Sequence, residues 1–167
     1  MKISKETKSQ LIKYAAIAVG VLVVINYIKK LNPFAAVEQD KSDVLSLQGS
    51  TKGWDIMYWD SPDAHSYLVG LGRDKINSIS AIVDSLFNLL QTVNMSNDQV
   101  DSVYNLLQTR VGSQAELSWL SHAYWVTTMP QETLADAITG VNKLGYGVGW
   151  NNAKSIFEWA SKLPDTL

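Results

Sequence analysis

The chain of 167 residues contains no cysteine and only two histidines. The lack of cysteine excludes disulfide bonds and thiolate metal sites, and it removes the usual indicator of redox compartment. Lysine and arginine together number 14, against 16 aspartates and glutamates. Phosphate binding needs clustered basic side chains, so this balance argues against nucleic acid as the partner of the main domain.

Patterns typical of strands and of cofactor sites are also scarce. Period-two alternation of apolar and polar residues is almost absent, which predicts an all-α fold. The glycine-rich stretch 145–149 is no phosphate loop, because no strand precedes it and no Gly-Lys-Ser/Thr follows. Asp60, Asp63 and His65 have a spacing that can bind a metal, but Asp63 is explained by the first turn of a helix, where a carboxylate favours the helix dipole. No metal and no cofactor are predicted.

What the chain does contain is a long apolar stretch, Leu11–Ile28, which is uninterrupted from Tyr14 to Ile25. Its 18 residues span about 27 Å as a helix, close to the hydrocarbon thickness of a bilayer. We therefore predict a transmembrane helix over 11–32, preceded by a basic tail over 1–10. The residues that define this anchor, with the lysines at its ends, are Lys13, Tyr14, Ile17, Val19, Val21, Leu22, Val23, Ile25, Lys29 and Lys30.

Two alternatives remain for this stretch. A secretory signal peptide also has a basic start and a short apolar core, but no small-x-small cleavage site follows, and Lys29 and Lys30 act as a stop. A buried core helix is the other alternative, although such helices rarely lack a polar face over this length. Pro33 is expected to end the helix, because it disfavours helical geometry in the residue before it.

Charge divides the molecule into two parts. Residues 1–30 contain six lysines and one glutamate, a net charge of +5, whereas residues 31–167 contain eight basic and fifteen acidic side chains, a net charge of −7. The lysine excess before the apolar core favours an N-terminus on the cytoplasmic side and a main domain on the other side, in a host envelope or in the internal membrane of a virion.

The rest of the chain is expected to form a polar linker over 33–53 and a helical domain over 54–167. Within the linker, the apolar patch Val44–Leu47 is a candidate to dock on the domain. In the domain, Trp54, Trp59, Trp125 and Trp150 are candidates for an interaction surface, although the same side chains could instead fill a small core.

Helix signals predict a bundle of about five short helices. Ser61-Pro62 starts the first, which stops near Gly70. Apolar residues at spacings of three and four then predict one helix over 76–90. Serine or threonine followed three residues later by Gln or Glu indicates capping boxes at Ser96, Ser113 and Thr128. The last helix starts near Asn151 and ends before Pro164.

Part of the domain resembles one annexin-type repeat, a right-handed bundle of five short helices. The resemblance lies in an apolar helix that ends in Thr109-Arg110, then Gln114 and Leu117, a third helix with Ala123-Tyr124, and Leu134 and Ile138 in a fourth. It implies a fold and no activity. The calcium loop of that family is a Gly-x-Gly-Thr turn, whereas the corresponding segment here, 91–97, contains no glycine, so calcium-dependent lipid binding is not implied.

Two functions of different class fit these features. The first is a single-pass membrane protein with a structural or interaction role, whose helical domain docks a protein neighbour. The alternative is a membrane-tethered hydrolase that cleaves peptidoglycan with Glu116, Glu132 or Glu158 as general acid. No partner carboxylate is implied by spacing, and Glu116 and Glu132 are explained as cap-region carboxylates, so the interaction role is the main prediction.

Overall fold

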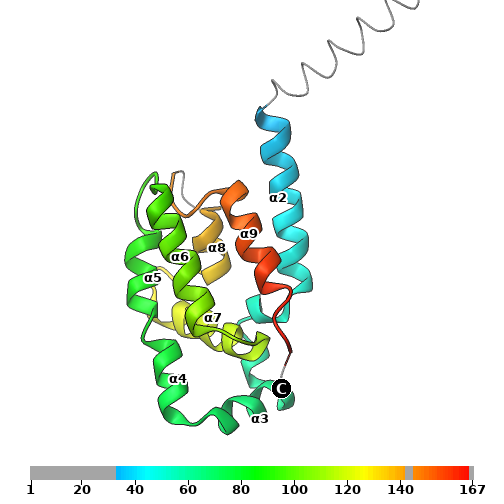
Figure 1. Cartoon of the computed structure of the whole chain (residues 1–167), viewed down its shortest axis with the longest axis vertical. Coiled ribbons are helices and arrows are strands. Elements are labelled where there is room, and N and C mark those ends of the chain that lie inside the picture. Colours follow the sequence, from blue (N-terminus) through cyan, green and yellow to red (C-terminus); the bar gives the residue numbers. More distant parts are fainter. Residues whose placement is uncertain (1–32, 142–144, 166–167) are drawn as a thin grey trace, which may run out of the picture. The chain divides into compact units, whose positions relative to one another are not determined.

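The computed structural model describes residues 33–141 and 145–165, and all regular elements in these ranges are helices (Figure 1). The all-α prediction is therefore confirmed for this part of the chain. In the described part after Trp54 there are seven α-helices, where about five were expected, and one short 3₁₀ turn; a second 3₁₀ turn ends at Trp54. The elements in chain order are α2 (Pro33–Ser50), η1 (Lys52–Trp54), η2 (Tyr58–Asp60), α3 (Pro62–Leu71), α4 (Arg73–Ser80), α5 (Val83–Leu90), α6 (Asn97–Arg110), α7 (Gln114–Thr127), α8 (Leu134–Thr139) and α9 (Trp150–Ala160).

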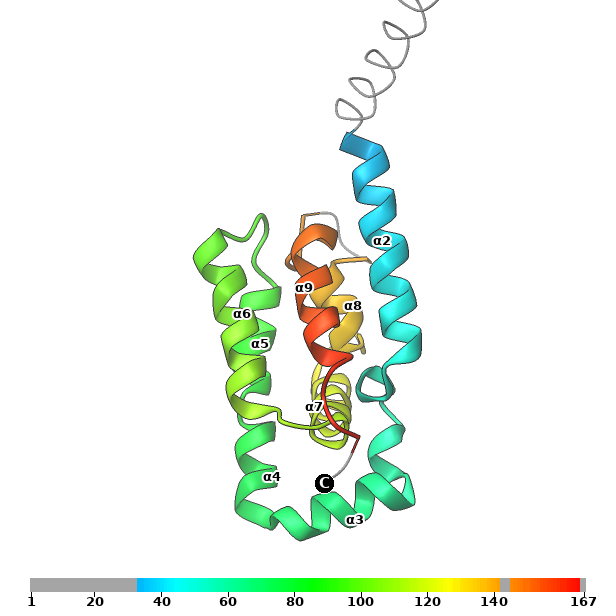
Figure 2. The ribbon, with the colours of Figure 1, turned by 45° about the vertical axis from the view of Figure 1, so that its right-hand side comes forward.

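Residues 40–165 form one body around helix α7. In Figure 1, α7 lies across the lower ends of α5, α6, α8 and α9, and in Figure 2 it is seen nearly end-on. It contacts η1, η2, α3, α4, α5 and α8. Small residues such as Ala115, Ser118 and Ser121 allow these elements to approach closely, while Leu117 and Tyr124 fill the core beside them. Helix α7 is therefore buried on most of its circumference.

Most predicted helix starts are confirmed by their caps. Ser61 Oγ accepts a hydrogen bond from Ala64 N at the start of α3, and Ser96 forms a complete capping box with Gln99 at the start of α6. The start predicted at Thr128 is wrong. Thr128 ends α7, and α8 is instead capped by Thr133, whose Oγ1 accepts from Asp136 N at 3.1 Å. Thr128 is followed by Gln131 at the spacing of a capping box, whereas Thr133 is followed by Asp136, so the capping-box pattern favoured the wrong threonine.

The single helix predicted over 76–90 is also wrong, because the chain turns at Ala81–Ile82 and forms α4 and α5. Helix α4 packs on α3 and α7, whereas α5 packs on α6 and α7. Ile79, Val83 and Leu86 are all buried, so the apolar spacing continues through the turn. The periodicity thus records which side faces the core and does not record the change of direction.

The segment expected to be a polar linker is mostly helix. Pro33 begins α2 at its first residue, and the helix continues to Ser50. Val44 is fully buried in the core and Leu47 packs against it, so the predicted docking of Val44–Leu47 is confirmed. Lys154 Nζ on α9 lies 2.5 Å from Asp43 Oδ2 and 3.7 Å from Asp40 Oδ1. From Asp40 onward the segment therefore belongs to the domain.

Candidate functional site

The predicted anchor over 11–32 lies outside the described residues. Within the ranges that the structure describes, no helix is both long enough and apolar enough to cross a membrane. The anchor therefore stays a prediction, and the site is built from the domain.

The four candidate tryptophans occupy three different environments. Trp54 belongs to the core, because its side chain is only 5% exposed and its ring stacks on Phe157 with centroids 4.5 Å apart. Trp150 begins α9 and is half-buried, with Lys41 Nζ 5.8 Å from its ring centroid. Trp59 and Trp125 are half-buried and belong to the same group of rings. The structure thus brings together two of the four.

This group, the aromatic cluster, consists of Trp59, Trp119, His122 and Trp125. The imidazole of His122 lies at its centre, with centroid distances of 4.7 Å to Trp59, 6.1 Å to Trp119 and 6.3 Å to Trp125. Three members lie on α7 at spacings of three residues, which places them along one side of the helix. Trp119 and His122 were not among the interface candidates predicted from the sequence. The three-residue spacing would have grouped them with Trp125.

Trp59 reaches the cluster because the strap, residues 51–60, is fastened to α7 by hydrogen bonds. Ser118 Oγ accepts from Trp59 N at 2.9 Å and donates to Asp55 O at 2.5 Å. Ser121 Oγ donates to Gly53 O at 3.1 Å. These buried hydroxyl groups add hydrogen bonds to the backbone of the strap, whose own backbone hydrogen bonds are limited to short turns such as Tyr58 N to Asp55 O.

Gln114 fixes the start of the strap and the C-terminal segment together. Its Oε1 accepts from Gly53 N at 2.7 Å, and its Nε2 donates to Ala160 O at 2.7 Å and to Leu163 O at 3.2 Å. The backbone at Gly53 lies so close to α7 that a Cβ atom there would come within 2.6 Å of Leu117 Cδ2. A larger residue at this crossing would have to displace the side chains of Leu117 and Gln114.

An apolar pocket of about 200 Å³ adjoins the aromatic cluster. Its walls come from η2, α3, α4 and α7, and Val69 in them is 64% exposed. Trp59 and Trp119 belong both to the cluster and to the pocket. The lining residues are Trp59, His65, Leu68, Val69, Ile76 and Trp119. We call the aromatic cluster together with this pocket the aromatic face.

Two polar atoms in the aromatic cluster are buried and lack a hydrogen-bond partner among the described residues. They are Trp59 Nε1 and His122 Nδ1. Trp119 differs, because its Nε1 donates to Ser80 Oγ at 2.9 Å. Buried polar atoms without partners are uncommon in native proteins. Trp54 Nε1 and Tyr124 Oη in the core also lack a partner among the described residues, so these atoms alone do not distinguish the cluster from the core.

The three glutamates of the hydrolase alternative lie in different environments. Glu116 is 2% exposed, and its Oε2 accepts from Gly112 N at 2.5 Å while Oε1 lies 3.8 Å from Lys75 Nζ. This geometry satisfies the backbone ahead of α7 and is that of a cap. Glu132 is half-buried before α8, and Glu158 is exposed on α9. Within 33–141 and 145–165, no three Asp, Glu or His side chains converge as metal ligands do.

Tyr124 on α7 is a buried side chain with a strongly shifted acidity. Burial raises the pKa of its phenol well above the ordinary value of about 10, and the negative charge of Glu132 raises this pKa further. The phenolic oxygen has no hydrogen-bond partner among the described residues. Tyr124 therefore keeps its phenolic proton to a higher pH in the folded domain than an exposed tyrosine does.

The chain was also compared with known proteins. Neither a protein-family profile, nor a curated protein, nor a solved structure matches it. The annexin-type resemblance stays a prediction.

Proposed function

We propose that the chain is a single-pass membrane-anchored interaction protein whose helical domain binds a protein neighbour through the aromatic face. The stretch 11–28 supplies the anchor. The lysine bias around it places the N-terminus on the cytoplasmic side and the domain on the other side of a cell-envelope or virion membrane. The anchor and the membrane topology are both proposed without any catalytic centre in the domain.

The observation that carries the docking role is the apolar pocket beside the aromatic cluster. Pockets for small molecules and cofactors typically measure about 300–1,000 Å³. The pocket here is smaller, about 200 Å³, and the walls are mostly apolar side chains. Such a site suits one apolar side chain of a protein. Tryptophan is also the residue type most enriched at the energetic centres of protein interfaces.

The charge around the aromatic face indicates what kind of protein fits. From Asp55 to Gly72 the sequence contains three aspartates and no lysine or arginine, and Arg73 and Lys75 follow on α4. Two of them, Asp60 and Asp63, are exposed on the segment that leads into α3. Complementary charge favours a partner that places lysine or arginine beside the inserted apolar side chain.

Photocrosslinking tests this function in the full chain in its native membrane. A photoreactive amino acid at His65, which is exposed and lines the pocket, should crosslink reproducibly to one protein. The crosslinked peptide should contain lysine or arginine next to an apolar residue. The same amino acid at Leu45, an exposed apolar position on α2 outside the aromatic face, serves as the control.

A second substitution separates specific from accidental crosslinks. Val69→Asp puts a carboxylate at the exposed rim of the pocket, so it should abolish the crosslink from His65 without unfolding the domain. A crosslink that survives Val69→Asp, or that appears equally from Leu45, would refute the aromatic face as the docking surface.

A further inference from the structure

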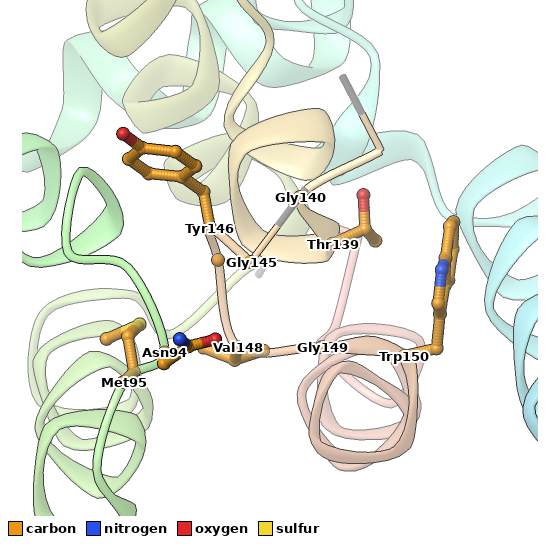
Figure 3. A pocket seen from close by; sticks show the side chains of 10 residues that line it. Asn94, Met95, Thr139, Gly140, Gly145, Tyr146, Val148, Gly149 and Trp150 are labelled. Atoms are coloured by element: carbon orange, nitrogen blue, oxygen red, sulfur yellow. The ribbon is translucent and has the colours of Figure 1, made fainter. Parts of the chain in front are cut away.

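A second group of apolar and aromatic side chains lies at the end of the domain where α9 begins. Two turns meet there: 92–96 between α5 and α6, and 145–150 before α9 (Figure 3). Asn94 N donates to Gly145 O at 2.6 Å, which joins the two turns, and Val148 N donates to Ile138 O at 2.8 Å. We call these two turns the loop end.

The loop end exposes apolar surface on both of its turns. Val93 is 48% exposed, and Met95, Tyr146 and Trp150 are half-buried. The last three line one open cavity of about 320 Å³, and Figure 3 shows Met95 and Tyr146 on one side of it and Trp150 on the other. A Cβ atom at Gly145 would lie 3.2 Å from Val93 Cγ1, so Val93 is continuous with this surface.

Charge is absent from the sequence of both turns. Residues 91–97 and 145–153 contain no Asp, Glu, Lys or Arg, although residues 31–167 as a whole carry a net charge of −7. The aromatic face differs, because its segments contain charged residues: three aspartates lie in 55–72, and Arg73 and Lys75 follow on α4. The loop end is therefore the better of the two aromatic regions for contact with anionic lipid.

The N-terminal part of the chain joins the domain at this same end. Lys41 Nζ lies 5.8 Å from the ring of Trp150, and Lys154 pairs with Asp40, so the start of the domain is beside the start of α9. Only eleven residues lie between Ile28 and Asp40, so these two residues are at most about 40 Å apart even when the chain between them is fully extended. A bilayer that holds 11–28 is therefore within reach of the loop end.

We propose that the loop end docks on the headgroup region of the bilayer that holds residues 11–28. Trp150 and Tyr146 have the amphipathic rings that favour the membrane–water interface, while Val93 supplies apolar surface to bury. Interfacial segments of this kind enter the headgroup region to a depth of about 5–10 Å. This inference rests on the proposed function, because it needs the anchor in the membrane.

Because the chain has no cysteine, single-cysteine variants of the full chain can report depth directly. Val21→Cys reports on the anchor, Val93→Cys on the loop end, and Val69→Cys on the aromatic face. Each variant is labelled with a small environment-sensitive fluorophore and reconstituted in vesicles of phosphatidylcholine and phosphatidylglycerol. The vesicles contain lipids that carry a nitroxide quencher either near the headgroup or near the end of the acyl chain.

The inference predicts a different loss of fluorescence for each label. The Val21→Cys label should be quenched most by the acyl-chain nitroxide, the Val93→Cys label most by the headgroup nitroxide, and the Val69→Cys label by neither. Quenching of the first with no more quenching at Val93→Cys than at Val69→Cys would overturn the inference and leave the anchor standing. An unquenched Val21→Cys label would refute the anchor, and the inference with it.

Discussion

The aromatic face and the loop end both present tryptophan at a partly exposed surface, yet they differ in construction and in charge. The aromatic face is built on a long buried helix, α7, and its strap is held by the hydroxyl groups of Ser118 and Ser121. The loop end is built on backbone turns with Gly145, Gly147 and Gly149 at positive φ. The aromatic face has aspartates in the segment that leads into α3, whereas the two turns of the loop end contain no charged residue and have Lys41 beside Trp150. Exposed aromatic residues alone therefore do not indicate the kind of partner. The charged and polar groups around them do.

If the aromatic face and the loop end are the two interaction surfaces, then Trp54 belongs to the core and to neither of them. Substitution of Trp54 by alanine tests this and has the largest expected effect on stability. Trp54→Ala removes a ring that is 5% exposed and stacked on Phe157, so it should lower the free energy of unfolding by about 3–5 kcal/mol. Trp125→Ala, at a half-buried position of the aromatic cluster, should lower it by about 1 kcal/mol. Urea denaturation of the full chain in detergent measures both. Equal losses of unfolding free energy in Trp54→Ala and Trp125→Ala would show that Trp54 is not more deeply part of the core than Trp125.

Gly147→Ala should damage the loop end selectively. Gly147 has φ +71°, and a Cβ atom there would come within 2.5 Å of Ile138 O and 2.6 Å of Ala137 O. Because backbone atoms cannot move aside cheaply, we expect a loss of about 3 kcal/mol in the free energy of unfolding. Gly70→Ala is the matched control, because no atom lies within 4 Å of its Cβ position.

In the vesicle assay, Gly147→Ala should also reduce quenching of the Val93→Cys label while the crosslink from His65 persists. If Gly147→Ala abolished both the quenching of the Val93→Cys label and the crosslink from His65, the aromatic face and the loop end would not be independent surfaces.

Gly53→Ala should damage the aromatic face selectively and somewhat less severely. The new methyl group would meet Leu117 and Gln114, which are side chains and can shift in part, so we expect a loss of about 2 kcal/mol. The crosslink from His65 should weaken, because the strap carries Trp59 into the aromatic cluster. Gly49→Ala has open space at its Cβ position within α2 and should leave both stability and crosslinking unchanged or slightly improved. Thermal unfolding of Gly53→Ala and Gly49→Ala measures the two changes in stability. Equal melting temperatures would contradict the prediction.

The smallest effect concerns Tyr124, which lies in the core that both regions share. Burial raises its pKa in the folded state, so above pH 10 the unfolded chain loses this proton while the folded chain keeps it. Stability is therefore full below pH 10 and falls at higher pH, by at most about 1.4 kcal/mol per pH unit.

Tyr124→Phe removes this dependence. Because the phenolic oxygen lacks a partner among the described residues, the variant should be nearly as stable as the parent at pH 7 and more stable than it at pH 11. Unfolding curves at both values provide the test. Identical alkaline losses in the two proteins would show that the phenol ionises as easily folded as unfolded.

Local signals predicted the parts of the fold that are decided locally. Ser61 and Ser96 were recognised as helix caps because their partners lie three residues away. The turn at Ala81–Ile82 was missed, because it is decided by what α4 and α5 pack against and leaves the apolar spacing unbroken. The helical content of 33–50 was missed for a related reason. Its polar composition suggested a linker, and only a few residues such as Val44 reach the core.

The candidate site shows the same limit. Spacing on α7 could have grouped Trp119, His122 and Trp125, since residues three apart share one side of a helix. Trp59 could not have been added from sequence, because 60 residues separate it from Trp119 and its position depends on hydrogen bonds from Ser118. Trp54 was a reasonable interface candidate until its stacking on Phe157 placed it in the core.

The most direct test of the two-region account is paired photocrosslinking of the full chain in its native membrane. The photoreactive amino acid is placed at His65 in one variant and at Val93 in another, and the products are identified by mass spectrometry. The account predicts a protein adduct from His65 and lipid adducts from Val93. Lipid adducts from both positions, or the same protein from both, would contradict it.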